Sequence, residues 1–173
     1  MTVIVNTIEA DIYALAPKLR QEDKEELYAA TGMKPLEALL HAYVASDKHV
    51  IKTIFVGDEQ VGIFGVNPSA VSGIGFIWML GTDKLKLLRK ELVTEARTHI
   101  NHFCTIYPVL TNVVYSKNIT HIKWLHKLGF KFLRRYDNMG YKNKYSFYHF
   151  IYHDIPIDIM DVIKPSIKET KDV

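Results

Sequence analysis

The chain has 173 residues, a length that suits one domain of ordinary size with a single hydrophobic core. Hydrophobic residues make up 48% and charged residues 24%, and no apolar run approaches the ~20 residues that cross a bilayer, so we expect no membrane-spanning segment. The single cysteine, Cys104, excludes an internal disulfide and a zinc site of several thiolates. The acidic N-terminus does not resemble a signal peptide, which favours a protein that stays in the cytoplasm where it is made.

The net charge of +3 is too small to indicate nucleic-acid binding by itself, but the charges are clustered. Basic residues gather in KLKLLRK (84–90) and KFLRRY (131–136), and acidic residues gather in QEDKEE (21–26). Solvated faces of helices or strands are the simplest interpretation of these clusters. A partner that carries phosphate is the alternative. Nucleic acid ranks last among the possible partners, because few aromatic residues alternate with the basic ones.

The N-terminal part predicts one strand followed by helices. Pro17 is expected to break or kink the first helix, Gly32 suits the end of the second, and Pro35 suits the first turn of the third. The expected elements are a strand at 2–6 and helices at about 8–19, 22–32 and 33–46.

The remaining residues predict strands that alternate with helices. A polar loop, GDEQ (57–60), separates two apolar runs and predicts a hairpin. The run GIGFIWMLG (73–81) is apolar on both faces, which predicts a central strand. The final residues, 154–173, lack periodicity and are expected to form an extended tail after a single domain at 1–153. The other expected elements are strands at 51–56, 61–66, 109–116, 131–137 and 144–154, and helices at 83–103 and 118–130.

This order of elements resembles the GNAT superfamily of acetyl-CoA-dependent N-acetyltransferases, and NITHIKWLHKLGF (118–130) carries much of the likeness. The superfamily pattern in this region runs Asn, a small residue, an aromatic, a Tyr and then Gly-Phe. The resemblance implies an α/β (α+β) fold, with a mixed, mostly antiparallel sheet of about seven strands and helices on both faces. The matching positions are Asn118, His121, Trp124, Leu125, Gly129 and Phe130.

Two departures from the superfamily pattern concern the chemistry. A glycine-rich turn would hold the diphosphate of acetyl-CoA on free backbone N–H groups, but LGTDKLKLL (80–88) contains one glycine, and a plain helix cap at Thr82 or Asp83 is the simpler interpretation. A Tyr would protonate the departing thiolate, but Leu125 stands there and has no proton to donate, so no catalytic residue is assigned. If acetyl-CoA binding is retained, the residues expected to bind it are Met79, Leu80, Gly81, Thr82, Lys84 and Asn118.

Two histidines on the same helix are candidates for replacing the missing proton donor. His121 lies one turn before Leu125 on the same side of the helix, where we expect a hydrogen-bonded core histidine. His126 projects about 100° away and cannot substitute. Tyr115, on the strand before this helix, and Asp58 and Glu59, in the hairpin loop, are further nominal acids or bases.

A narrower resemblance covers most of the chain. Segments such as VGIFGV, WMLGTDKL and YPVLTNVVYSKNITHIKWLHKLGF are similar to acetyltransferase-like proteins of tailed bacteriophages, labelled internal virion protein A or internal core protein. The resemblance implies a degenerate acetyltransferase without a cofactor, which is made in the host cytoplasm and serves as a structural or assembly component of the virion. Other virion proteins are the implied partners, with 154–173 as a candidate docking arm.

The alternative is an active acetyl-CoA-dependent N-acetyltransferase that acts on an unknown amine. It requires an open splay between the strands at 73–80 and 109–116. Filling of that splay by Trp78, Met79 and Trp124 would exclude this alternative.

Overall fold

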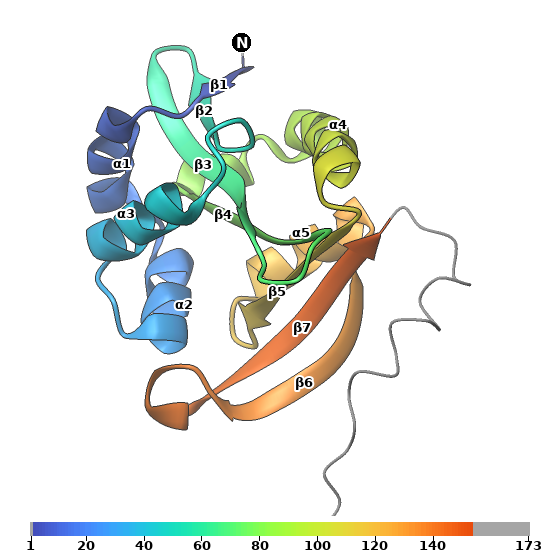
Figure 1. Cartoon of the computed structure of the whole chain (residues 1–173). Helices are drawn as coiled ribbons and strands as arrows, with labels where there is room; N and C mark the ends of the chain where they lie inside the picture. The colour runs from blue at the N-terminus through green and yellow to red at the C-terminus, as the bar shows by residue number, and fades with distance from the viewer. Residues whose placement is uncertain (1, 154–173) are drawn as a thin grey trace, which may run out of the picture.

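A computed structural model describes residues 2–153, apart from the side chains of residues 89–91, and the tail expected at 154–173 lies outside the described residues. One seven-stranded sheet has the strand order β1-β2-β3-β4-β5-β7-β6 (Figure 1). All neighbouring strands are antiparallel except β4 and β5, which are parallel, so the predicted mixed, mostly antiparallel sheet is confirmed. The strands are β1 (Thr2–Asn6), β2 (Lys52–Val56), β3 (Glu59–Pro68), β4 (Ile74–Gly81), β5 (Val109–Tyr115), β6 (Lys131–Met139) and β7 (Tyr145–His153).

Helices cover both faces of the sheet, as the order of elements predicted (Figure 1). Pro17 lies in a 3₁₀ turn, η1 (Ala16–Lys18), that follows the first helix, as expected. No helix within residues 2–153 is long and apolar enough to cross a membrane. One face carries α1 (Glu9–Leu15), α2 (Gln21–Thr31) and α3 (Pro35–Ala45), and the other carries α4 (Arg89–Ile106) and α5 (Ile119–Leu128).

Two of the differences from the predicted element boundaries have a clear structural cause. The hairpin turn is tighter than the predicted loop at 57–60, because Glu59 already pairs with Val56 across β2 and β3. The long helix begins at Arg89 rather than at 83, because Asp83–Lys86 form a 3₁₀ turn, η2, before it. Leu85 of this turn is buried in the core beside Gly62 and Gly81, and its position shapes the candidate site described below.

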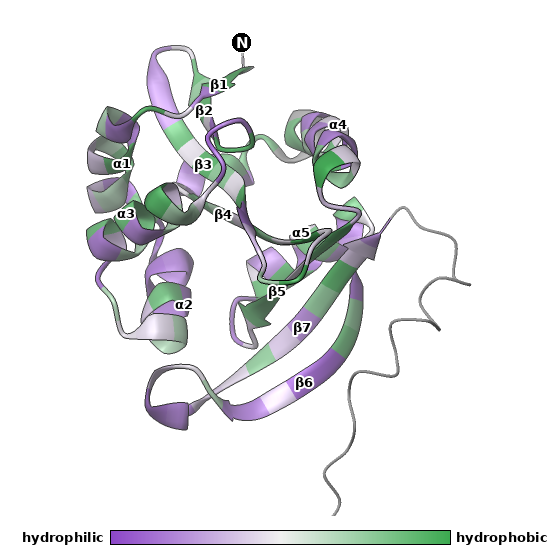
Figure 2. Ribbon diagram, viewed as in Figure 1, coloured by the Kyte–Doolittle hydropathy of each residue, from purple (hydrophilic) through white to green (hydrophobic). Residues whose placement is uncertain are grey.

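Two apolar layers hold the helices on the sheet. The larger cluster packs α4 and α5 against one face and includes Phe103 and Leu110, while the other packs α1 and α3 against the opposite face and includes Leu15 and Leu39. Figure 2 shows the resulting contrast, with the central strands β4 and β5 mostly hydrophobic and the edge strand β6 mostly hydrophilic. The basic cluster at 131–136 lies on β6, where charge discourages pairing with another sheet.

The sheet opens between its two parallel strands. Pairing of β4 with β5 is limited to Ile74–Phe76 and Val109–Thr111. Beyond these residues the Asn112 side chain stands between the strands: its Nδ2 donates to the carbonyl of Ile77 (2.9 Å), and its Oδ1 accepts the N–H of Val113 (2.8 Å). The splay that the enzyme alternative required is therefore present, and it positions the candidate site.

Candidate functional site

The edge of β4 that faces the splay is closed at both ends and open in the middle. The Asn112 bridge closes one end. At the other end the N–H of Gly81 donates to Asp23 Oδ2 (2.9 Å), and the carbonyl of Gly81 accepts the N–H of Arg20 (2.9 Å). Between them, Met79 turns its backbone N–H and C=O toward the splay, because alternate residues of a strand face the same side and β5 no longer pairs there. One amide donor and one acceptor are thus presented to a ligand.

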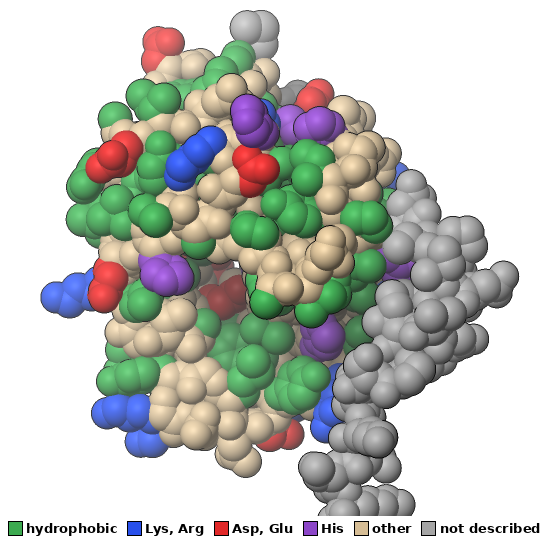
Figure 3. Space-filling view, in the orientation of Figure 1, with side chains coloured by type: hydrophobic (Ala, Val, Ile, Leu, Met, Phe, Trp, Pro, Cys, Tyr) green, Lys and Arg blue, Asp and Glu red, His purple; other side chains and the backbone are tan. Residues whose placement is uncertain are grey.

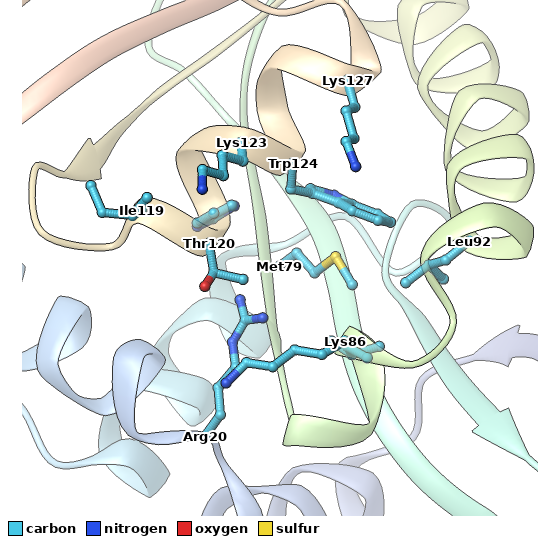
Figure 4. Close-up of a pocket in the computed structure, with 11 residues that line it drawn as sticks. Arg20, Met79, Lys86, Leu92, Ile119, Thr120, Lys123, Trp124 and Lys127 are labelled. Atoms are coloured by element: carbon cyan, nitrogen blue, oxygen red, sulfur yellow. The ribbon is translucent and has the colours of Figure 1, made fainter.

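A cavity of about 180 Å³ lies at the mouth of the splay, between the end of β4, α4 and α5 (Figure 4). Met79, Leu92 and Trp124 form apolar walls. Trp78 packs with the core cluster under α1 and α3, where its Nε1 donates to Asn67 Oδ1 (2.8 Å), and together with Met79 and Trp124 it also lines an adjoining apolar cavity of about 50 Å³. Met79 and Trp124 border the cavity without closing it, so the condition that would exclude the enzyme alternative is not met.

Cationic side chains line the rim of this cavity: Arg20, Lys86, Lys123 and Lys127 (Figure 4). Arg20 is already paired, since its Nε lies 2.8 Å from Asp23 Oδ1. Lys86 is paired with Glu22 (2.8 Å), and this contact holds the pKa of Glu22 below its usual value. Lys123 and Lys127 are exposed, lie one turn apart on α5, and form no ion pair with any described carboxylate. These two lysines are the cations left available to an anionic ligand.

The turn after β4, where the superfamily pattern places a diphosphate cradle, is closed on itself. The N–H groups of Leu85, Leu87 and Leu88 donate to carbonyls within the turn at 3.2, 3.0 and 3.3 Å. Leu85 is only 5% exposed and fills the space beside Gly81. A diphosphate requires unpaired N–H groups and close approach to the backbone. These three N–H groups and the space beside Gly81 are therefore not available to a diphosphate.

The six residues predicted to bind acetyl-CoA do not converge on one cavity. Of these six, Met79 alone lines the cavity at the mouth of the splay. Leu80 belongs to the core cluster under α1 and α3, and Lys84 is ion-paired with Glu59. Thr82 stands at the N-cap position of η2 rather than of the long helix, and it does not cap it as the simpler interpretation expected, because its buried hydroxyl has no partner among the described atoms. The backbone of Gly81 is bonded to Arg20, just before α2, and to the Asp23 side chain in the first turn of α2. Asn118 lies at the start of α5, which it caps.

His121 borders both the cavity at the mouth of the splay and the adjoining apolar cavity of about 50 Å³. Glu26 of α2 reaches it from the other face: Glu26 Oε1 lies 3.5 Å from His121 Nδ1, and Glu26 Oε2 accepts from Asn118 Nδ2 (2.8 Å). Asn118 in turn caps α5 by accepting the N–H of His121 (3.1 Å). His121 is thus a largely buried histidine with a polar partner, as expected, but it also faces a cavity. Sequence reasoning missed Glu26, because it lies 92 positions before its partner Asn118.

The charges around His121 favour its protonated form. Burial alone lowers the pKa of His121, but the carboxylates of Glu26 and Asp23 outweigh burial, and the pKa is raised above its usual value. Burial raises the pKa of Asp23, while the Arg20 guanidinium acts against that rise. The site therefore holds a shielded histidine–carboxylate pair beside the cavity, an arrangement that perturbs proton affinity at many functional sites.

The other candidates do not border the cavity at the mouth of the splay. Leu125 is buried in the core cluster beneath α4 and α5. Tyr115 packs against Phe147 (5.6 Å between ring centroids), and His126 packs against Phe132 (4.5 Å). Among the described residues, no group of three or more His, Cys, Asp or Glu side chains is placed to hold a metal ion.

Comparison with known proteins supports the fold. No family model and no curated protein matches the sequence. Among solved structures, the chain is similar to Ard1 from Thermoplasma volcanium (16% identity over 90% of this chain and 99% of that chain, TM-score 0.65). It is also similar to a GNAT-family acetyltransferase from Streptococcus pneumoniae (14% identity over 88% of this chain and 99% of that chain, TM-score 0.57). A third similar structure is spermidine N-acetyltransferase from Vibrio cholerae, solved with CoA and spermine (8% identity over 88% of this chain and 95% of that chain, TM-score 0.64). Similarity at these identities shows the fold, so this chain has the fold of the GNAT acetyltransferases.

Proposed function

We propose that this chain is a bacteriophage protein with the GNAT fold and a reduced acetyl-transfer site, which serves as a structural or assembly component of the virion. The turn after β4 carries the reduced-site part of the proposal, because the N–H groups of Leu85, Leu87 and Leu88 bond within the turn and the Leu85 side chain fills the space beside Gly81. Leu125, buried where the superfamily pattern has a proton donor, supports the same conclusion. The phage and virion parts rest on the sequence resemblance, which covers most of the chain.

Calorimetric titration with acetyl-CoA tests the reduced site. We expect no saturable binding at acetyl-CoA concentrations up to about 1 mM, because the site lacks a diphosphate cradle in this proposal. A dissociation constant of about 1 mM corresponds to a binding free energy of roughly 4 kcal/mol. Tight binding of acetyl-CoA that depends on its nucleotide half would overturn the proposal that the acetyl-transfer site is reduced.

Purified particles test the virion role. We expect the chain to be present in a fixed ratio to the capsid protein by quantitative mass spectrometry, and particles made without it to lose infectivity. The chain with His121→Gln should restore infectivity as well as the wild type does, because assembly needs no proton transfer. Absence from particles that remain fully infectious would contradict the virion role. The proposed location is the host cytoplasm during infection and then the virion, with other virion proteins as partners through residues 154–173.

A second candidate is an active acetyl-CoA-dependent N-acetyltransferase, and the open cavity at the splay favours it. Figure 3 adds a hollow in the face formed by α2, α3 and β5, with an acidic side chain deep inside, which suits a cationic amine. In this case His121, with Glu26 beside it, is the group that holds a proton at the cavity wall. Release of free thiol from acetyl-CoA, measured over a set of amines and abolished by His121→Gln, would support this candidate and overturn the reduced site.

A further inference from the structure

We infer that the outer edge of the sheet, strand β6 with the turn that follows it, binds a single strand of nucleic acid. The inference goes beyond the proposed function, because a structural component of a virion need not contact nucleic acid. It rests on the charges that this edge carries and on the aromatic rings that lie beside them.

Positive charge is concentrated in the last part of the described chain. Residues 96–153 contain nine Lys and Arg and a single acidic residue, Asp137, although the whole chain has a net charge of only +3. Five of the nine bases lie within residues 131–144, which run through β6 and the 3₁₀ turn η3 (Tyr141–Asn143) to the start of β7. Charge of one sign gathered on one part of a surface attracts a polyanion.

Most of these bases are exposed and have no acidic partner. Arg135 is the exception, because its Nε lies 2.9 Å from Asp137 Oδ1. Since β6 is the outer strand and Lys131–Met139 extends for roughly 26 Å, the other bases follow one long edge of the sheet (Figure 1). The bases that form no ion pair with a described carboxylate, which we call the β6 stripe, are Lys131, Arg134, Lys142 and Lys144.

Protection of the edge against other sheets explains only part of this charge. Lys142 and Lys144 lie beyond β6, in and after η3, where there is no strand edge to protect. The opposite edge strand, β1, has the sequence TVIVN and carries no charged side chain. Charge is therefore not a general device for protecting the edges of this sheet, and the β6 stripe calls for a further explanation.

Pairing of β6 with β7 brings aromatic rings next to the bases. The Arg134 guanidinium lies 4.9 Å from the ring centroid of Tyr136, and that ring lies 6.1 Å from the ring of His149 on β7. Arg135 lies 5.8 Å from the ring centroid of Tyr148, also on β7. Aromatic rings and guanidinium planes are the groups on which unpaired bases of nucleic acid stack. The alternation of basic and aromatic residues that is weak along the chain is thus present in space.

A single strand suits this edge better than a duplex. The bases of a duplex are stacked on one another and present only their edges in the grooves, whereas the bases of a single strand can expose their faces to a ring such as Tyr136. The β6 stripe also follows one strand of the sheet, which suits one line of phosphates. We therefore expect phosphates to contact the β6 stripe while one or more bases stack on the Arg134–Tyr136 pair.

Fluorescence anisotropy of the full chain with a labelled oligothymidylate of about 12 nucleotides tests the inference. We expect the dissociation constant to rise about 20–50-fold between about 50 and 200 mM salt, because three or four phosphate contacts give a logarithmic slope of about −2 to −3. The duplex of this strand with oligoadenylate should bind at least about tenfold more weakly. Equal or tighter binding of the duplex would overturn the inference.

Matched variants locate the phosphate contacts. Lys131→Gln with Arg134→Gln should weaken binding at least about tenfold at low salt and make the logarithmic slope shallower by about 1.4, since two contacts are lost. The control, Lys18→Gln with Lys34→Gln, removes two exposed lysines outside the β6 stripe and should change neither quantity. An equal loss in both double variants would show attraction by net charge alone and overturn the inference.

Substitution of Tyr136 tests stacking separately from charge. Tyr136→Leu should weaken binding about fivefold or more and leave the salt slope unchanged, while Tyr136→Phe keeps the ring and should bind as the wild type does. Tyr13→Leu, at an exposed tyrosine of α1, is the control and should have no effect. A comparison that needs no variant uses polyphosphate of the same charge, which has no bases and should bind at least about fivefold more weakly than oligothymidylate. Equal binding of polyphosphate would contradict stacking and overturn the inference.

The outcomes separate this inference from the proposed function. No binding of oligothymidylate or oligouridylate at about 50 mM salt would overturn the inference and leave the virion role in place. Absence of the chain from infectious particles would contradict the virion role and leave the inference in place. Oligothymidylate and oligouridylate share the phosphates and the exposed bases, and the tighter of the two identifies DNA or RNA as the source of the strand.

Discussion

Leu85 and Leu87 stand two positions apart in the same turn and lie in opposite environments, the first 5% exposed and the second 83% exposed. A pattern of leucines and lysines does not reveal which leucine turns inward, because that depends on the space beside the distant Gly62 as well as the adjacent Gly81. The structure settles that Leu85 turns inward and fills the space beside Gly81.

This contrast gives a matched pair of substitutions. We expect Leu85→Ala to lower the free energy of unfolding by about 2–5 kcal/mol, since it removes a buried side chain and leaves a cavity. Leu87→Ala should change it by less than about 0.5 kcal/mol. Urea denaturation followed by circular dichroism measures both, and similar losses in the two variants would contradict the placement of Leu85.

The raised pKa of His121 makes stability depend on pH in a defined direction. Glu26 and Asp23 raise it, while burial and Arg20 oppose them. A histidine with a raised pKa contributes stability that is fully present below the unfolded value, about 6.5, and is lost as pH rises through the folded value. We expect the free energy of unfolding of the wild type to fall as the pH rises from about 6.5 through the folded pKa of His121. The His121→Gln variant should not show this decrease.

An imidazole NMR titration checks the same point directly. His121 should titrate above the usual pKa of histidine and His149 below it, because burial lowers the pKa of His149. The reverse order would contradict the pairing of His121 with Glu26.

At the scale of elements, α5 follows closely from its own sequence. Its Asn118 cap accepts the N–H of His121, and Gly129 ends the helix with φ +95, as the local pattern predicted. Both features need only residues within one turn. The start of α4 was predicted wrongly at 83, because the burial of Leu85 in the turn before it depends on a contact with β3 that local spacing does not contain.

Asn118 caps α5 and also donates a hydrogen bond to Glu26 of α2, and substitutions can separate these two roles. We expect Asn118→Ala to lower the free energy of unfolding by about 1–3 kcal/mol, because the helix loses its cap and Glu26 loses a donor. Asn118→Ser should recover about 1 kcal/mol of this by restoring the cap. Thermal denaturation at neutral pH measures both, and full recovery by Ser would show that the bond to Glu26 contributes nothing.

At the scale of the whole molecule, the described strands and helices end at His153, and the domain boundary predicted there stays a prediction. A chain that ends at His153 should unfold in one transition, within about 2 °C of the midpoint of the full chain. Differential scanning calorimetry compares the two. A large fall in the midpoint would place residues beyond His153 within the domain.

By itself, the sequence determined the order of strands and helices along the chain, the helix caps at Asn118 and Gly129 and the two departures from the GNAT pattern, because these depend on alternation, helical spacing and contacts within a turn. The tertiary structure alone decided that the splay is open, that Leu85 closes the turn beside it, and that Glu26 meets His121. Each of these depends on segments far apart in the chain: 58 positions separate the partners that close the β4 edge, and 92 separate those that hold the start of α5. Local sequence patterns do not predict such contacts, because only the packing of the whole chain brings the segments together.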